Sequence, residues 1–333
     1  MKQKRMCKTG KNSKIAYYIK SYYALLIPRF FLRRRLKTMM KKYANSSEKQ
    51  YIDRRIDYYC RLGNVDETEK EPWMQQFTCL SEQKKVRPSV YYLDSFRYAR
   101  YFPMTLKWNL CPGDVNYIPQ MPSIVKSRPI DPKNNAFSVL LKLDRVRHFV
   151  FLHDSKPWEK KLDKVIFRGA IGQKEGNEYK KNRFLFMSKY FNHPMCDLGE
   201  IAENGCVNPQ WVKPKLTLYE HLDYKFIMAL EGNDVASNLK WVMSSNSIAV
   251  MPKPKYETWF MEGTLIPDRH YIEIKEDFSD LEEKLRFYIA HPDKAASIIR
   301  HAHEFVAQFR NRKREEMISL LVLKKYFEHT NPK

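Results

Sequence analysis

Glycine is scarce and cysteine is scattered, and each shortage excludes a class of protein. Ten of the 333 residues are glycine, which excludes collagen-like chains and glycine-rich linkers. The six cysteines form no CxxC pair, and none has a histidine at the spacing of zinc ligands. Scattered cysteines in a chain of this length are typical of reduced thiols in a cytosolic protein. We therefore expect neither a disulfide framework nor a bound metal.

Long apolar runs are also absent. The longest one near the start, residues 22–27, is interrupted by Pro28 and Arg29, so it is far shorter than the roughly 20 residues that cross a bilayer. No secretory signal is visible. Hydrophobic residues nevertheless make up 43% and aromatic residues 14% of the chain, which is enough for a sizeable folded core. We expect a folded protein that can lie on a membrane without crossing it.

Acidic residues are missing from the first 47 positions. This arm, residues 1–47, contains fourteen Lys and Arg residues, and the first acid is Glu48. Because the whole chain has a formal charge of +22, the remaining residues carry only +8. Tyrosine and phenylalanine are interspersed with the cations between Tyr17 and Arg35. The arm predicts either a monotopic membrane-surface element or a helix that packs its rings on the body, with a nucleic-acid-binding arm as a third alternative.

The rest of the chain changes character near residue 161. Upstream, helices are predicted over 48–64 and 91–102, and the loop-rich segment 112–132 contains five prolines. Downstream, apolar strands alternate with helices, which predicts a parallel sheet covered on both faces. The expected strands are 165–167, 225–230, 247–251 and 270–274. The expected domains are the arm 1–47, an N-terminal lobe over 48–160, a C-terminal lobe over 161–310 and a final helix over 311–333.

Polar residues follow the expected strands at the edge where ligands of a parallel sheet bind. Arg168-Gly169 and the segment 231–234 come directly after two of these strands and should line one crevice. The dinucleotide fingerprint GxGxxG is absent, and so is the phosphate loop GxxxxGK followed by Ser or Thr. A diphosphate would therefore have to meet cations directly, and Arg168, Arg183 and Lys240 are the candidates. On spacing alone, an arginine of this kind is more often a surface ion-pair partner than a ligand.

Several motifs in this half resemble glycosyltransferase family 90. They are residues 225–241 with 244–247, the segments 256–259 and 265–271, and the run Phe167-Arg168-Gly169-Ala170. Residues 125–130 are similar to the bacterial lipopolysaccharide branch of this family, which also includes fungal capsule-associated xylosyltransferases and animal Rumi-type protein O-glucosyltransferases. The resemblance covers roughly residues 120–310.

The resemblance implies a GT-B fold, in which two Rossmann-like lobes face a cleft and the C-terminal lobe binds a nucleotide-sugar. Members are metal-independent, inverting enzymes that use UDP-sugars, so no cofactor is expected besides the donor substrate. The residues implied at the donor phosphates are Arg168, Gly169, Ala170, Arg183, Asn233, Ser237 and Asn238. The residues implied at the border of the donor nucleotide are Glu257, His270 and Tyr271.

One departure from the family pattern concerns the diphosphate. Animal members have an arginine where this chain has Asn238. We therefore expect Lys240 and Arg183 to supply the missing positive charge.

A second departure concerns the general base. Animal members have a catalytic aspartate where this chain has Pro129, whereas an inverting transfer needs a base to take the proton of the acceptor hydroxyl. Asp131 is the nearest substitute and Asp114 is the second choice. Asp131 and Pro132 could equally form a turn that has no part in the chemistry.

The resemblance and the charge pattern together predict a hexosyltransferase that uses a UDP-sugar and acts on a hydroxyl of a lipopolysaccharide or related surface glycan. Its expected place is the cytoplasmic face of the inner membrane, as a peripheral protein on an anionic surface. A catalytically inactive glycan-binding protein on the same fold is one alternative, which Pro129 supports. A basic nucleic-acid-binding protein is another, but no nucleic-acid motif is present and we expect no nucleic-acid partner.

Overall fold

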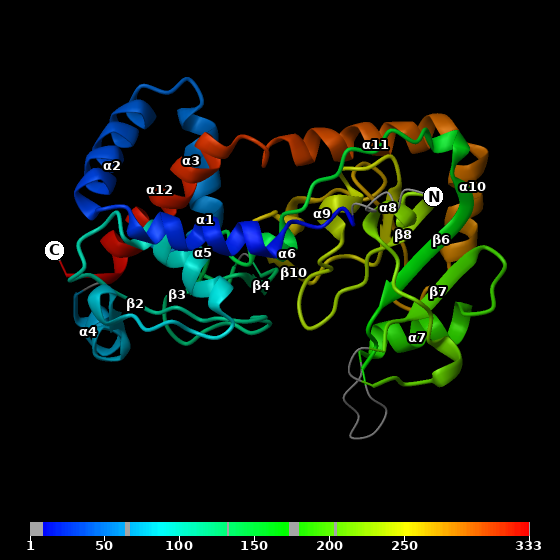
Figure 1. The fold of residues 1–333 in the computed structure, drawn as a ribbon, viewed down its shortest axis with the longest axis horizontal. Coiled ribbons are helices and arrows are strands. Elements are labelled where there is room, and N and C mark those ends of the chain that lie inside the picture. The colour runs from blue at the N-terminus through cyan, green and yellow to red at the C-terminus, as the bar shows by residue number, and fades with distance from the viewer. Residues whose placement is uncertain (1–8, 64–66, 132, 173–179, 203–204, 333) are drawn as a thin grey trace, which may run out of the picture. The chain divides into compact units, whose positions relative to one another are not determined.

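The computed structural model describes residues 9–63, 67–131, 133–172, 180–202 and 205–332 (Figure 1). The chain divides into two compact units. The first, the sheet unit, comprises the described parts of Met1–Asn12, Arg147–Pro254 and Thr264–Gln308. The second, the helical unit, comprises the described parts of Ser13–Val146, Lys255–Gly263 and Phe309–Lys333. Each unit is therefore assembled from segments that lie far apart in the sequence.

The described part of the sheet unit contains one parallel sheet of five strands, in the order β11-β9-β8-β6-β7. The strands are β6 (Leu162–Gly169), β7 (Cys196–Glu200), β8 (Tyr224–Met228), β9 (Ile248–Met251) and β11 (Ile272–Glu273). Val165, Phe226 and Val250 are fully buried, as expected for strands that are covered on both faces. The predicted parallel sheet is confirmed, and β7 is a fifth strand that the sequence pattern did not indicate.

The helices of the sheet unit are α7 (Lys181–Tyr190), α8 (Leu218–His221), α9 (Leu239–Val242), α10 (Leu281–Ala290) and α11 (Pro292–Ala307), and the short α6 (Arg145–His148) lies at the division between the units. Phe186 of α7, Leu285 of α10 and Ile298 of α11 join the strand residues in one apolar core. Burying such side chains contributes about 1.5–3 kcal/mol each. This core fixes the carboxyl ends of β6 and β8, where the predicted ligand residues lie.

The helical unit is organised around α12 (Arg312–Thr330), which has buried side chains along most of its length. α12 packs against α2 (Arg29–Ala44), α3 (Lys49–Tyr59), α4 (Glu67–Gln76) and α5 (Ser89–Ala99), and α1 (Lys14–Leu26) packs against α5. The described part of the predicted arm is thus two helices. Pro28 separates them, because proline has no N–H with which to continue the hydrogen bonding of α1. At the position just before α2 it gives up no helical hydrogen bond, so it is tolerated there. Among the described residues, no helix is both long and apolar enough to cross a bilayer.

The strands of the helical unit come in pairs. β1 (Thr78–Cys79) pairs with β2 (Lys107–Trp108), β3 (Ser123–Val125) with β5 (Ser138–Leu140), and β4 (Ser127–Pro129) with β10 (Tyr256–Thr258). Proline has no N–H for a strand ladder, and the proline-rich segment that begins at residue 112 contains strands of only three residues. The mixed α/β class is confirmed. The described residues of this unit form no second Rossmann-like lobe, however, so the GT-B arrangement is not confirmed.

Candidate functional site

Arg183, in the first turn of α7, ties together the chain segments that follow β6 and β8. Its Nη1 donates to the Ala170 carbonyl at 2.8 Å, its Nη2 to the Leu230 carbonyl at 2.9 Å and its Nε to the Glu231 carbonyl at 3.2 Å. No carboxylate of the described chain pairs with this guanidinium, and burial lowers its pKa to about 10. The carboxyl end of the sheet therefore holds a positive charge that carbonyl dipoles solvate but that no carboxylate among the described residues neutralises.

Two glycines leave room around this guanidinium. A Cβ atom on Gly169 would lie 2.8 Å from Cζ of Phe167 and 3.5 Å from Nη1 of Arg183. A Cβ atom on Gly232 would lie 3.2 Å from Nη2 of Arg183. Gly169 is the last residue of β6 and Gly232 follows β8, and both keep backbone and guanidinium close together at the sheet edge.

Arg168 lies at the end of β6 but has an anionic partner. Its Nη1 donates to the backbone carbonyl of Asp197 at 2.9 Å and its Nη2 to Oδ1 of Asp197 at 2.8 Å. Burial by itself raises the pKa of Asp197, but hydrogen bonds from Tyr224, Arg168 and Lys213 outweigh it and hold this pKa at about 2. Asp197 lies on strand β7, which the sequence pattern did not indicate, so this partner was not predicted. Arg168 is therefore already neutralised within the sheet unit.

The other residues expected at the donor phosphates differ in how accessible they are. Ala170, Asn233 and Ser237 are exposed. Asn238 precedes α9 and donates from Nδ2 to the Met228 carbonyl at 2.9 Å, so it fastens the segment after β8. Lys240, in α9, is completely buried. Arg183 is thus the better placed of the two cations expected to compensate for Asn238.

His270 and Tyr271 come just before β11, and both rings are buried. Nδ1 of His270 accepts a hydrogen bond from the Ile266 N–H at 2.9 Å, and burial, with help from the neighbouring Arg269, lowers the pKa of His270 to about 4. The Tyr271 hydroxyl donates to Oε2 of Glu273 at 2.5 Å. At neutral pH the imidazole is therefore uncharged, and both polar groups already have partners inside the sheet unit.

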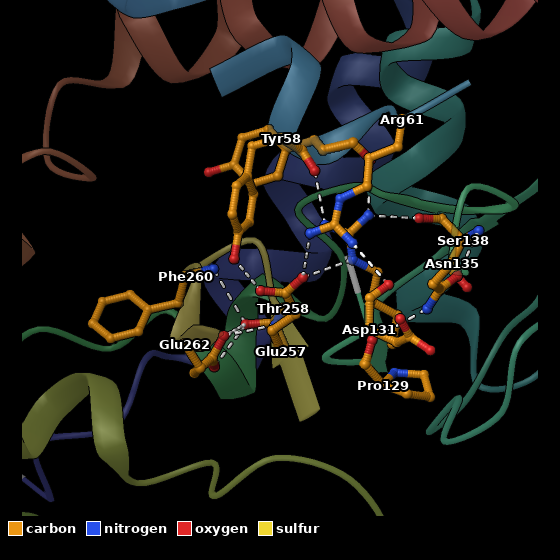
Figure 2. A network of polar contacts seen from close by, with 12 residues as sticks. Tyr58, Arg61, Pro129, Asp131, Asn135, Ser138, Glu257, Thr258, Phe260 and Glu262 are labelled. Atoms are coloured by element: carbon orange, nitrogen blue, oxygen red, sulfur yellow. Dashed lines mark hydrogen bonds and ion pairs between the residues drawn. The ribbon is translucent and has the colours of Figure 1, made fainter. Parts of the chain in front are cut away.

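Glu257 belongs to the helical unit, unlike the other residues implied at the donor. Figure 2 shows the polar contacts around its carboxylate. Its Oε1 accepts from Nε of Arg128 at 2.8 Å and from Nη2 of Arg61 at 3.2 Å, and its Oε2 accepts from the Tyr58 hydroxyl. The side chains of Arg128 and Glu257 are both 0% exposed. Burial lowers the pKa of Arg128, but Glu257 opposes that shift. The carboxylate is therefore saturated by two guanidinium groups and a phenol.

Arg128 extends this network to the backbone of α3 and β5. Its Nη2 donates to the Tyr58 carbonyl at 2.7 Å and its Nη1 to the Ser138 carbonyl at 2.9 Å. The chain after β10 is held in turn by Glu262, which accepts from the Thr258 N–H at 2.6 Å (Figure 2). The segment 255–263 is thus fastened to the helical unit by buried polar contacts.

Asp131, the first candidate for the base, closes a turn directly beside this network (Figure 2). Its Oδ1 accepts from the N–H groups of Lys133 and Asn134, each at 3.1 Å, and its Oδ2 accepts from Nδ2 of Asn134 at 3.1 Å. These hydrogen bonds lower the pKa of Asp131. The carboxylate therefore closes a turn, while Pro132 lies outside the described residues.

Asp114, the second candidate, lies before β3 in the same unit. Its carboxylate pairs with the ammonium of Lys126, and its side chain is 25% exposed whereas that of Lys126 is 1% exposed. A buried lysine thus fixes one oxygen of a carboxylate that still reaches solvent. Among the described residues, no group of three His, Cys, Asp or Glu side chains could hold a metal ion.

Comparison with known proteins identifies the family. The family model described as Glycosyl transferase family 90 matches residues 144–328, which include nearly all of the sheet unit together with β10 and most of α12. O-glucosyltransferase LpsA of Dichelobacter nodosus is 37% identical over 323 residues, which cover 96% of each chain.

Two animal proteins match over a shorter stretch. Protein O-glucosyltransferase 1 of Rattus norvegicus is 26% identical over 160 residues, or 45% of this chain and 38% of the rat protein. Protein O-glucosyltransferase 2 of Danio rerio is 24% identical over 162 residues, or 46% of this chain and 30% of the fish protein. Because the family model covers more than half of the chain and one relative matches nearly all of it, this chain belongs to glycosyltransferase family 90 and is a glycosyltransferase.

Proposed function

We propose that this glycosyltransferase moves a hexose from a UDP-sugar to a hydroxyl of a lipopolysaccharide or related surface glycan, with inversion and without a metal ion. The observation that carries the donor assignment is the guanidinium of Arg183, which lies at the carboxyl end of the sheet and pairs with no carboxylate of the described residues. A diphosphate is the kind of ligand that such a cation attracts. The nearly full-length relative named as an O-glucosyltransferase supports a glucose-type sugar.

In the proposed reaction, the acceptor hydroxyl oxygen attacks the anomeric carbon of the donor sugar. The bond between that carbon and the diphosphate oxygen breaks, and its electron pair leaves with UDP. Negative charge therefore grows on the diphosphate, where Arg183 stabilises it. The exposed Asn233 and Ser237 after β8 add polar contacts to the same group.

The proton of the acceptor hydroxyl goes to an aspartate carboxylate. Asp131 and Asp114 are the two proposed bases, and a different contact limits proton transfer to each of them. Asp131 has a lowered pKa and uses both oxygens in its own turn, so it accepts a proton only if that turn loosens. Asp114 has one oxygen on Lys126 but is partly open to solvent, which gives a hydroxyl access to it.

Turnover of a radiolabelled UDP-sugar on a lipid-linked acceptor tests both the reaction and the base. Replacing the true base with asparagine should leave donor binding intact and lower turnover by about 10²–10⁴-fold. Asp131→Asn and Asp114→Asn form the comparison, and a screen of nucleotide-sugars by thermal shift identifies the donor beforehand. If neither variant lowers turnover, the proton goes to a residue other than Asp131 and Asp114, and both proposed bases are wrong.

We also propose that the protein works at the cytoplasmic face of the inner membrane, where lipid-linked acceptors are built. The acid-free arm supports this location, since cations attract anionic lipid headgroups.

A further inference from the structure

The first helix of the helical unit presents two opposite faces. Towards α5, the Tyr17 hydroxyl donates to Asp94 at 2.8 Å and Ser21 is buried. Away from α5, a stripe of large apolar side chains is left in solvent. Its members and their exposed fractions are Ile15 (75%), Ile19 (65%), Tyr23 (70%) and Leu26 (77%). Their spacing of three or four residues puts them on one side of the helix, so α1 buries one side and exposes an apolar one.

This apolar stripe continues around the corner into α2. Ile27 follows Leu26, and after Pro28 come Phe30 and Phe31, which are 66% and 58% exposed. Residues 15–31 thus contain eight of the sixteen large hydrophobic side chains that are exposed in the described chain. Scattered exposed hydrophobic residues are ordinary, whereas a continuous patch marks an interaction site. We call residues 15–31 the apolar wedge.

The wedge is surrounded by cations. Lys14, Lys20, Arg33, Arg34 and Lys37 are all exposed, and no acidic residue occurs before Glu48. None of these five cations forms an ion pair with a described residue, whereas Arg35 pairs with Glu316 at 2.6 Å. The occupant of this surface must therefore offer an apolar layer together with negative charge.

The wedge is also mounted firmly on the unit. The guanidinium of Arg100, in the chain just after α5, donates to the carbonyls of Ala24 and Ile27 at 2.9 and 2.7 Å. Arg29 donates to the Phe102 carbonyl at 3.0 Å. These contacts hold the corner between α1 and α2 in place, so whatever binds the wedge holds the helical unit as well.

We propose that the apolar wedge enters the headgroup region of an anionic bilayer, with Leu26, Ile27, Phe30 and Phe31 at its leading edge and the flanking cations on lipid phosphates. This inference deepens the proposed membrane location by naming the surface, and it does not depend on the sugar or the acceptor. A bilayer supplies apolar depth and negative charge together. A second copy of the chain would instead bring one acid-free helix pair against another and leave the cations facing each other.

Co-sedimentation of the full chain with vesicles tests this surface. Vesicles rich in phosphatidylglycerol should bind the protein, and pure phosphatidylcholine should bind it far less. The double change Leu26→Gln with Phe30→Gln should lower the vesicle partition coefficient by at least about a hundredfold, because each buried apolar side chain contributes about tenfold or more. The matched control, Leu162→Gln with Leu185→Gln, removes two exposed leucines outside the wedge and should leave binding unchanged.

The cations are tested in the same assay. Removing Lys20, Arg33 and Arg34 by changes to Gln should lower partition roughly a hundredfold, at about fivefold for each cation. The control triple, Lys160→Gln with Lys164→Gln and Lys275→Gln, removes exposed lysines outside the arm and should bind nearly as the parent does.

Three results would overturn the proposal. The first is that the wedge variants bind vesicles as well as the parent does. The second is that the parent forms a dimer that depends on the wedge and does not bind vesicles. The third is that the parent binds duplex DNA or RNA in a salt-sensitive way and does not bind vesicles. Nucleotide-sugar binding by the same variants, followed by thermal shift, is a separate readout. If the protein binds vesicles but no nucleotide-sugar, the proposed donor is wrong and the proposed role of the wedge is retained. If it binds a nucleotide-sugar but no vesicles, the proposed role of the wedge is wrong and the proposed donor is retained.

Discussion

The two units compensate the charge of an arginine in opposite ways. In the helical unit, Arg128 faces the carboxylate of Glu257, and neither side chain is exposed. In the sheet unit, Arg183 is surrounded by three backbone carbonyls, and no carboxylate of the described chain pairs with it. The first charge is neutralised within the fold, whereas the second keeps its attraction for an anion. A buried cation indicates a ligand site only when its partners leave the charge uncompensated.

Arg168 lies between these two cases. It lies at the end of β6, at the same carboxyl edge of the sheet as Arg183, and it belongs to the motif that resembles the family. Its Nη2, however, pairs with Oδ1 of Asp197 at 2.8 Å, which neutralises its charge. The comparison therefore ranks the arginines by how much charge each has left for a diphosphate. Arg183 has the most, Arg168 has less, and Arg128 has the least.

Breaking the paired charge should have the largest effect. Glu257→Gln keeps the shape of the side chain but removes the negative charge that faces two guanidinium groups. Losing one partner of a buried ion pair costs about 3–5 kcal/mol of stability. We expect the free energy of unfolding in urea to fall by that amount. Glu328→Gln is the control in the same unit, because its pair with Lys324 is largely exposed and should contribute far less.

The same variant also tests the role that the family resemblance implies for Glu257. If folded Glu257→Gln protein keeps its stability but loses UDP binding, the carboxylate acts on the donor and the structural interpretation is wrong. If stability falls while the remaining folded protein binds UDP normally, the network only holds the helical unit together.

Removing the uncompensated charge should have a smaller effect, and on ligand affinity. Arg183→Gln should weaken UDP binding by about ten- to a hundredfold, the value of a charge-assisted contact of about 1.5–3 kcal/mol. Arg168→Gln should weaken it less, because Asp197 already occupies that guanidinium. Isothermal titration with UDP measures both, and Arg183→Lys, which keeps the charge without the fork of donors, should fall between Arg183→Gln and the parent. Equal losses at positions 168 and 183 would contradict the ranking.

The residues at the sheet edge were predictable because their signals are local. An apolar run followed by Arg168-Gly169 or by the segment 231–234 places polar groups at strand ends whatever the rest of the chain does. The turn at Asp131 was foreseen as an alternative for the same reason, since an aspartate that accepts from the N–H groups two and three residues later needs no distant partner.

Partners that lie far apart in the sequence were not predictable. Arg128 and Glu257 are 129 residues apart, and the segment 255–263 joins the helical unit although the motifs on either side of it belong to the sheet unit. Asp197 was missed because β7 consists of Cys-Asp-Leu-Gly-Glu, which has too few apolar residues to show a strand period. In each case the missing information is a tertiary pairing rather than a local preference.

The smallest expected effect concerns the intermediate case, Arg168 with Asp197, and appears as a pH dependence. Hydrogen bonds from Tyr224, Arg168 and Lys213 outweigh burial and depress the pKa of Asp197 from an ordinary 3.8 to about 2 in the folded protein. A depressed carboxyl pKa contributes stability that is fully present above the unfolded-state pKa and is lost as the pH falls through the folded-state value. The affected window therefore runs from about pH 4 down to about pH 2.

Asp197→Asn removes this titration, so the stability gap between parent and variant should narrow by roughly 1 kcal/mol between about pH 5 and about pH 3. Urea unfolding of both proteins at the two pH values measures the gap, and Asp57→Asn, at a carboxylate whose side chain is 71% exposed, should keep a nearly constant offset from the parent. If the gap for Asp197→Asn is also constant, the carboxylate is not held ionised by Arg168. Arg168 would then have as much charge to offer a diphosphate as Arg183 has, and the distinction between the two arginines of the sheet edge would disappear.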